Sequence, residues 1–227
     1  MHLPKIGQAA LRHRRGLFGM AAAGLTIAGF LAGYVAAPVL AQRADVALDE
    51  LMASEALPDV ALGAREAPVT IVEYASMTCV HCAGFYATTF PELKSKYIDT
   101  GKVRFILREF PLDPLAAAGF MLARCAGDDK RNAIVDLLFA QQKNWAFTDK
   151  PLEALAALLK QTGMSQNNFE ACLKNQDLFD KIAKVHDRAA NKFGVTATPT
   201  FFINGKKERG EMTSDALAKV LDPLLKG

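Results

Sequence analysis

The stretch that decides the fold runs from Val69 to Cys82 and reads VTIVEYASMTCVHC. Its first six residues are mostly β-branched and do not alternate in polarity, which predicts a central strand buried on both faces. After the short turn 75–78, apolar side chains recur at helical spacing: Cys79, Cys82, Phe85, Tyr86 and Phe90. A strand therefore leads directly into a helix whose first turn carries a Cys-x-x-Cys pair.

The pair Cys79 and Cys82 has the spacing of a redox device. At the first turn of a helix, free N–H groups and the positive end of the helix dipole favour a thiolate over a thiol. The two intervening residues bring the second sulfur within bonding distance of the first. His81 adds a cationic or hydrogen-bonding group, and a more stable thiolate makes the disulfide more oxidising. The pattern predicts Cys79 as the exposed nucleophile and Cys82 as the resolving thiol.

Two other interpretations of this motif stay open. The same spacing suits a structural disulfide. Cys79, His81 and Cys82 are also three candidate metal ligands, but zinc usually takes a second ligand pair, and His186 stands in no partner pattern. The strand that leads into the helix favours the redox interpretation, for which we predict no metal and no dissociable cofactor.

The rest of the chain predicts a mixed sheet with helices on both faces. A second strand, 102–110, alternates in polarity. Strand signals return at 200–203, where Asn204-Gly205 predicts a type I′ hairpin turn, and a last helix ends near residue 225. We therefore predict an α/β fold.

Between the second and third strands, the apolar pattern is helical throughout. This block, 113–193, is too long for a loop, so we predict a small helical subdomain inserted into a domain made of 67–112 and 194–227. Residues 42–66 are Ala-rich and amphipathic and predict a helical linker. Within the block the expected helices are 115–125, 132–144, 151–160, 166–174 and 178–193.

The first 41 residues predict an export signal. They carry four basic residues and no acid, and the uncharged run that begins at Gly16 reaches small side chains at Ala41. This order is typical of a signal peptide cleaved after Ala41. The uncharged run also has the length of a bilayer span, so an uncleaved N-terminal anchor stays open. In both cases the basic end predicts that the bulk of the chain lies outside the cytoplasm.

Composition and charge exclude other classes of protein. The 227 residues are 51% apolar, which is enough for a full hydrophobic core. The formal net charge is +3, and without the four positive charges of residues 1–41 the remainder is about −1. No basic surface is left to attract nucleic acid.

A second motif, Thr198-Pro199, stands immediately before the strand 200–203. Proline has no N–H to donate to a ladder, so the start of a strand suits it. A cis proline facing the Cys-x-x-Cys pair, with backbone groups open to a substrate peptide, is the alternative. The residues alone leave both open.

Taken together, the segments 69–74, 79–82 and 198–205 resemble the DsbA-like family of periplasmic thioredoxin-fold proteins, which donate disulfide bonds. The similarity spans about residues 60–227 and includes the helical insertion. It implies a thioredoxin-like fold, a cis peptide bond at Pro199, and reduced or unfolded exported proteins as substrates. It also implies a membrane partner, a quinone-linked DsbB-like protein, that reoxidises the pair.

Two residues depart from the family pattern. Val80 stands where the best-known loop has proline, and Thr198 also resembles the disulfide isomerase relatives. Those isomerases dimerise through a separate N-terminal domain, for which residues 42–66 are too short. We therefore favour an oxidase. An isomerase or reductase fed by a transmembrane reductant is the alternative, and a metal-binding or interaction module on an inert fold is less favoured.

The resemblance also implies roles for residues outside the pair. In the family a buried acid six residues before the nucleophile tunes proton transfer, and Glu73 occupies this position. A raised pKa would let it take the proton from Cys82, and an exposed strand acid is the alternative. Some alphaproteobacterial relatives carry a structural disulfide, which implies one between Cys125 and Cys172; two buried, unpaired thiols stay open.

Overall fold

Strand β2 (Val69–Ala75) lies at the centre of the fold, and all seven of its residues are buried. The computed structural model describes residues 45–210 and 212–226, so the predicted leader, 1–41, with its cleavage site lies outside the described residues. The five-stranded sheet has the order β1-β3-β2-β4-β5. The other strands are β1 (Ala61–Leu62), β3 (Val103–Glu109), β4 (Thr200–Ile203) and β5 (Lys206–Arg209).

The sheet is mixed, as predicted. β2 runs parallel to β3, with Val69 opposite Val103, and antiparallel to β4, with Glu73 opposite Phe201. β4 and β5 form the expected hairpin, in which Asn204 and Gly205 both take positive φ, 47° and 84°. Positive φ at both central residues is the geometry of a type I′ turn.

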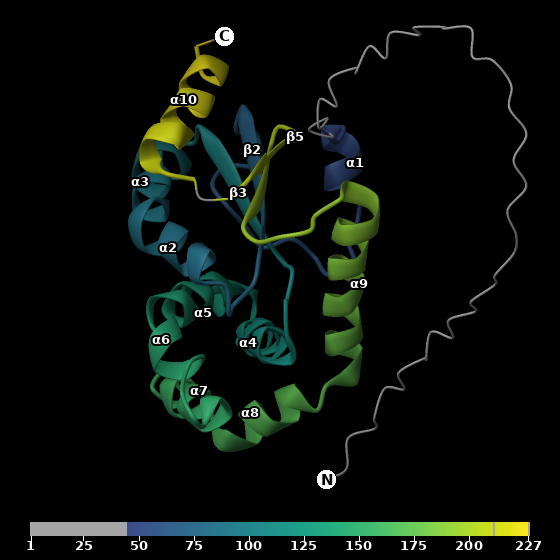
Figure 1. Ribbon diagram of the computed structural model, residues 1–227, viewed down its shortest axis with the longest axis vertical. Helices are drawn as coiled ribbons and strands as arrows, with labels where there is room; N and C mark the ends of the chain where they lie inside the picture. The colour runs from purple at the N-terminus through teal and green to yellow at the C-terminus, as the bar shows by residue number, and fades with distance from the viewer. Residues whose placement is uncertain (1–44, 211, 227) are drawn as a thin grey trace, which may run out of the picture. The chain divides into compact units, whose positions relative to one another are not determined.

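Helices cover both faces of the sheet (Figure 1). The long helix α9 and the short α1 lie on one side, and Arg188 of α9 donates to the Glu50 and Ala53 carbonyls at α1. The other side carries α2, α3 and α10, with a short π-helical turn after α3. The bounds are α1 (Leu48–Met52), α2 (Val80–Thr88), α3 (Phe90–Leu93), η1 (Lys94–Ile98), α9 (Gln176–Phe193) and α10 (Ser214–Leu224).

The helical block gathers at the end of the sheet to which β2 points (Figure 1). The predicted helix 132–144 is wrong in its bounds, because the chain forms two helices there. Gly127, with φ 93°, lets α5 begin four residues earlier, and Gln141, with φ −103° and ψ 12°, separates it from α6. The block contains α4 (Pro114–Cys125), α5 (Asp128–Ala140), α6 (Gln142–Trp145), α7 (Pro151–Lys160) and α8 (Gln166–Leu173).

Arg108 of β3 binds the segment 51–59, which precedes the strands of the sheet. Its side chain is buried and donates two hydrogen bonds to Asp59, at 2.9 and 2.8 Å, and one to Glu55 at 3.0 Å. It also donates to the Leu51 carbonyl and the Tyr74 hydroxyl. A buried guanidinium needs such partners because an unpaired charge in the interior is costly. Within 45–66 the predicted linker is helical only in α1, contains the two-residue strand β1, and is otherwise an ordered loop held by ion pairs.

None of the helices within 45–210 and 212–226 has the length and apolar character needed to cross a membrane.

Candidate active site

Cys79 lies directly before α2, at the end of the turn that follows β2. It N-caps the helix with φ −79° and ψ 118°, and its N–H donates to the Ser76 carbonyl at 3.1 Å. Cys82, in the first turn, is completely buried, and Cys79 is 9% exposed. Both are free thiols. Cys79 is less exposed than predicted because the turn at Thr198 lies against its sulfur, but it remains the more accessible of the two.

The Cys79 sulfur is set up as a thiolate. A hydrogen bond from the Cys82 thiol is the largest cause that lowers the pKa of Cys79, to about 5. Partial burial opposes this, while Thr198 and the backbone N–H groups of Cys82 and His81 add to the lowering. These N–H groups belong to the first turn of α2, where no helical carbonyl competes for them. At neutral pH Cys79 is therefore ionised.

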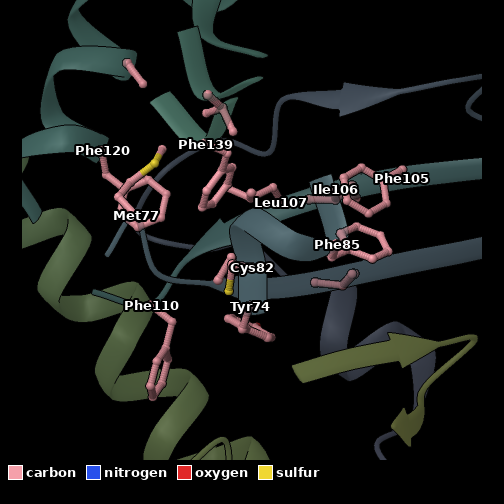
Figure 2. Close-up of a cluster of buried hydrophobic side chains, with 14 of the residues drawn as sticks. Tyr74, Met77, Cys82, Phe85, Phe105, Ile106, Leu107, Phe110, Phe120 and Phe139 are labelled. Carbon is pink, nitrogen blue, oxygen red and sulfur yellow. The ribbon is translucent and has the colours of Figure 1, made fainter. Parts of the chain in front are cut away.

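Cys82 has the opposite character. Burial raises its pKa far above the ordinary value of a thiol, and the hydrogen bond that it gives to Cys79 and the nearby Glu73 carboxyl act in the same direction. Figure 2 shows Cys82 inside the cluster of buried apolar side chains that includes Tyr74, Leu107 and Phe85. A sulfur in these surroundings leaves or attacks efficiently only if a neighbouring group gives or takes its proton.

Glu73 lies next to this sulfur, in the interior of β2. The residue is fully buried, and neither carboxyl oxygen has a hydrogen-bond partner among the described residues. Burial, followed by the negative charge of Cys79, raises the pKa of Glu73 well above its ordinary value, and the nearby Tyr86 hydroxyl opposes this only weakly. A carboxyl so deeply buried is held neutral. The carboxyl group can therefore store one proton beside Cys82.

The Thr198–Pro199 peptide bond is cis, and it presents the Thr198 carbonyl to the active-site pair. In its thiol form Cys79 donates to that carbonyl at 3.2 Å. The Thr198 hydroxyl is buried and has no hydrogen-bond partner among the residues described. Once Cys79 is ionised, this hydroxyl can donate to the sulfur. Two distant segments thus meet at a single sulfur atom.

Comparison with known proteins agrees with this arrangement. A family model described as thioredoxin matches residues 55–223. The alpha-DsbA1 structure from Wolbachia pipientis has a TM-score of 0.72 and 33% identity, covering 80% of this chain and 96% of that one. A Bacillus cereus protein named as disulfide bond formation protein D is 30% identical over 73% of this chain and 78% of its own length. This chain belongs to the DsbA-like thioredoxin family.

Rickettsial relatives extend the same comparison. A Rickettsia conorii protein named as a protein-disulfide oxidoreductase is 34% identical over 168 residues, which are 74% of this chain. The match spans 60% of the length of that relative.

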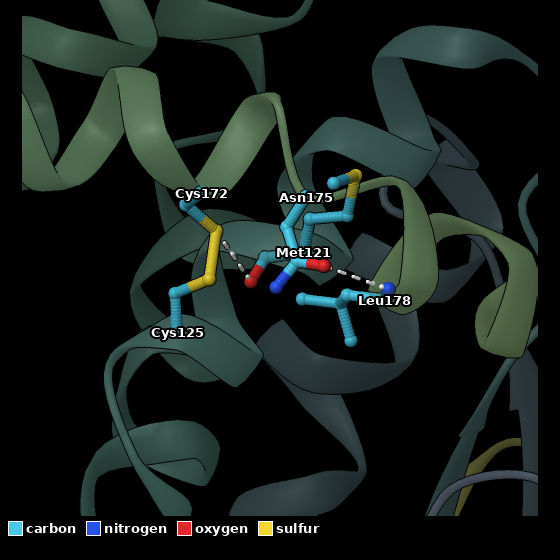
Figure 3. The surroundings of a disulfide bond; sticks show 5 residues. All are labelled: Met121, Cys125, Cys172, Asn175 and Leu178. Atoms are coloured by element: carbon cyan, nitrogen blue, oxygen red, sulfur yellow. Dashed lines mark hydrogen bonds between the residues drawn. A yellow bond between two sulfur atoms is a disulfide. The ribbon is translucent and has the colours of Figure 1, made fainter.

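The DsbA-like chain carries its second cysteine pair away from the active site. Cys125 and Cys172 form a disulfide with a Cα–Cα distance of 6.1 Å, and the Cys172 sulfur lies 3.1 Å from the Met121 carbonyl oxygen (Figure 3). The bond joins the end of α4 to α8. Asp113, at the other end of α4, contacts the active-site turn, so α4, which is about 18 Å long, connects the two regions.

The side chain of His81 lies at the surface, and its predicted role beside the thiolate stays a prediction. Its ring is exposed, and the hydrogen bond that lowers the pKa of Cys79 comes from its backbone N–H. Val80, beside it, is 56% exposed and carries an apolar surface at the mouth of the site.

Sequence reasoning misses two residues that hold the active-site turn. Asp113 accepts a hydrogen bond from the Thr78 hydroxyl at 2.5 Å while it caps α4. Gln142 of α6 donates to the Met77 and Cys79 carbonyls. Asp113 has a local signal, since an acid before Pro114 is a typical helix cap, but its second partner has none. Gln142 has no local signal at all.

Among the described residues, no group of three or more His, Cys, Asp or Glu side chains is placed to hold a metal ion.

Proposed function

We propose that this chain is a periplasmic protein-disulfide oxidase that works through Cys79 and Cys82. The observation that carries the proposal is the contrast between the two sulfurs. Cys79, with its pKa lowered to about 5, is a good leaving group, whereas Cys82 is buried beside the proton store of Glu73. A stabilised thiolate favours the reduced enzyme, and this makes the enzyme disulfide a strong oxidant.

The first step forms a mixed disulfide. In the oxidised enzyme a substrate thiolate attacks the Cys79 sulfur, the bond between Cys79 and Cys82 breaks, and its electron pair leaves on Cys82. Burial makes a thiolate at Cys82 unfavourable. Glu73, held neutral by the same burial, gives that sulfur its proton and becomes a carboxylate.

The second step releases the product. A second substrate thiol loses its proton to the Glu73 carboxylate or to water and attacks the substrate sulfur of the mixed disulfide. The new disulfide forms in the substrate, and Cys79 leaves as a thiolate. The substrate has lost two electrons, and the enzyme pair has gained them. Hydrogen bonds from Cys82, Thr198 and the first turn of α2 stabilise the leaving thiolate.

The turn at Thr198 gives the substrate its docking point in this proposal. Pro199 leads into β4, and its carbonyl accepts from the Gly210 N–H, so the backbone on that side is fixed. Backbone atoms beside a reactive sulfur can pair with an extended peptide whatever its side chains. Many different reduced proteins then fit the same site.

The proposal extends to location and partners. The basic, then apolar, then small-residue order of 1–41 supports export to the periplasm, where unfolded exported proteins are the substrates. Reoxidation needs an acceptor for the two electrons, and we propose a DsbB-like membrane protein for that role. The name of the Bacillus cereus relative, disulfide bond formation protein D, supports the same direction of electron flow.

The reduction potential of the Cys79–Cys82 pair tests the proposal. The full chain is equilibrated in glutathione buffers of graded redox poise, and the oxidised fraction is measured by alkylation and mass analysis. We expect a potential of about −120 to −150 mV, near that of strong disulfide donors. A value near about −180 mV would favour an isomerase, and one near about −270 mV a reductase. Metal binding that survives Cys79→Ser, with no thiol exchange in the wild type, would favour the inert module.

A further inference from the structure

The side chain of Gln142 links the helical block to the active-site turn. It is 3% exposed, and its amide nitrogen donates to the Met77 carbonyl at 2.9 Å and to the Cys79 carbonyl at 3.0 Å. A carboxamide NH₂ has two protons, so both are used on this one turn. Gln142 thus holds the residue that carries the reactive sulfur by its main chain.

The two carbonyls that accept from Gln142 lie in the turn before α2 and at the start of α2. The Cys79 carbonyl also accepts the Ala83 N–H at 3.1 Å, one of the first hydrogen bonds of α2. The Met77 carbonyl lies on the other side of Thr78, within the turn that ends β2. A donor shared between them fixes the orientation of the Met77–Thr78 and Cys79–Val80 peptide planes, which flank the pair Thr78–Cys79. That orientation decides where the first N–H groups of α2 point.

The helix that carries Gln142 is itself anchored. The Trp145 indole is fully buried and donates to the Leu138 carbonyl at 2.8 Å. Met77 is wedged against α4, since a Cβ added at Gly119 would lie 3.1 Å from its Cγ and 3.5 Å from the Trp145 ring. Figure 2 shows Met77 beside Phe120, on the side of the helical block. Gln142 therefore acts from a rigid base.

We propose that Gln142 is a positioning residue that keeps the turn at Cys79 in the conformation in which the His81 and Cys82 N–H groups face the Cys79 sulfur. It touches no reacting atom and acts through the backbone of Cys79. Through Gln142, the helical block then influences the ionisation of Cys79 and the redox equilibrium of the Cys79–Cys82 pair. This inference rests on the proposed function, in which Cys79 is the nucleophile and leaving group.

Two variants test it, with a matched control. Gln142→Met keeps the length of the side chain and removes both donors. Gln142→Glu keeps the shape and retains at most one donor, so it serves if the Met variant does not fold. Gln141→Met alters the neighbouring glutamine, whose side chain accepts from Asn144 and not from the active-site turn. The full chain is used in each case, and circular dichroism checks that it is folded.

The first readout is the thiolate absorbance at 240 nm of the reduced protein as a function of pH. We expect the midpoint of the Cys79 titration to rise by about one pH unit in Gln142→Met and Gln142→Glu. The second readout is the equilibrium with glutathione, which we expect to shift by about threefold to tenfold toward the oxidised enzyme. Gln141→Met leaves both unchanged. A role limited to stability would lower the unfolding midpoint and move neither readout.

The outcomes separate the inference from the proposed function. A folded Gln142 variant with the wild-type titration and the wild-type equilibrium overturns the inference. A wild type that titrates as expected but exchanges no disulfide with glutathione overturns the proposed function, and the titration of the variants still decides the role of Gln142.

Discussion

The two cysteine pairs of this chain have the same side chains in opposite surroundings. Cys79 and Cys82 lie three positions apart at the start of α2, beside the buried carboxyl of Glu73 and a turn from a distant segment. Cys125 and Cys172 lie 47 positions apart and join the ends of two helices. In the first setting the surroundings stabilise one ionised sulfur, and in the second they offer only a cross-link.

The surroundings of each cysteine decide its role. Near Cys79 the free N–H groups of α2 stabilise negative charge, and near Cys82 burial forbids it. Splitting the two pKa values in opposite directions creates a good leaving group and a protected resolving thiol. Cys125 lies in the last turn of α4 and is bonded to Cys172, and this bridge constrains the unfolded chain.

The largest expected effect comes from Cys79→Ser. Serine keeps the size of the side chain but cannot form the mixed disulfide, so the rate of oxidising a dithiol peptide should fall to the uncatalysed level. The matched control is the double variant Cys125→Ala with Cys172→Ala, which should keep the wild-type rate at a temperature where it is folded. Loss of activity in the double variant alone would exchange the roles of the two pairs.

The second prediction concerns stability, for which the Cys125–Cys172 pair should matter more than the Cys79–Cys82 pair. Removing the bridge with Cys125→Ala and Cys172→Ala should lower the free energy of unfolding by about 4 kcal/mol, since 47 positions of chain are released. Cys79→Ser should change it far less, because that loop closes only two intervening residues. Urea unfolding of both variants measures the difference, and equal losses would contradict the distinction between a structural and a redox pair.

The sequence predicts the elements around the Cys79–Cys82 pair better than the tertiary contacts that position this pair. β2, the start of α2 and the turn at Asn204 follow from local patterns, because buried strands, helices with regular apolar spacing and type I′ turns have their own residue preferences. Gln142 contacts a residue 63 positions away, and no local pattern signals such a pair. Its role follows only from tertiary packing.

Two features of the fold show the same limit. β1 is two residues long, too short for any periodicity, and exists because Ala61 pairs with Ile106. The first turn of α5 is polar, so its apolar pattern begins only later in the helix, and the earlier start depends on the positive φ of Gly127. Short elements and polar helix starts are fixed by the surrounding structure.

The third prediction tests Glu73, the buried acid beside Cys82. The pKa of Glu73 is raised on folding, so its contribution is complete below the ordinary value near 4.5 and is lost as pH rises toward the raised value. Glu73→Gln should therefore be more stable than the wild type by about 1–3 kcal/mol at pH 7, with the difference vanishing near pH 4. Urea unfolding of the reduced proteins at several pH values measures this.

A second buried acid supplies the control for that experiment. Glu109 pairs with Arg124 and Arg131, and these charges overcome burial and lower its pKa to about 2. Its contribution is present above the ordinary pKa and is lost as pH falls through the lowered one, so Glu109→Gln should destabilise the protein at pH 7. If both variants changed stability in the same direction, Glu73 would be an ionised, paired acid and not a neutral proton store.

The smallest expected effect belongs to Thr198. Its hydroxyl is one of several groups that stabilise the Cys79 thiolate, and the Cys82 thiol contributes more. Thr198→Val keeps the shape and removes this one donor, so the midpoint of the Cys79 titration at 240 nm should rise by about half a pH unit, the worth of one weak hydrogen bond. Thr196→Val, an exposed position in the same loop, should leave the midpoint unchanged. A shift as large as that of Gln142→Met would mean that the turn at Thr198 controls the sulfur as strongly as the helical block does. No shift would mean that the backbone of α2 and Cys82 suffice to hold the charge.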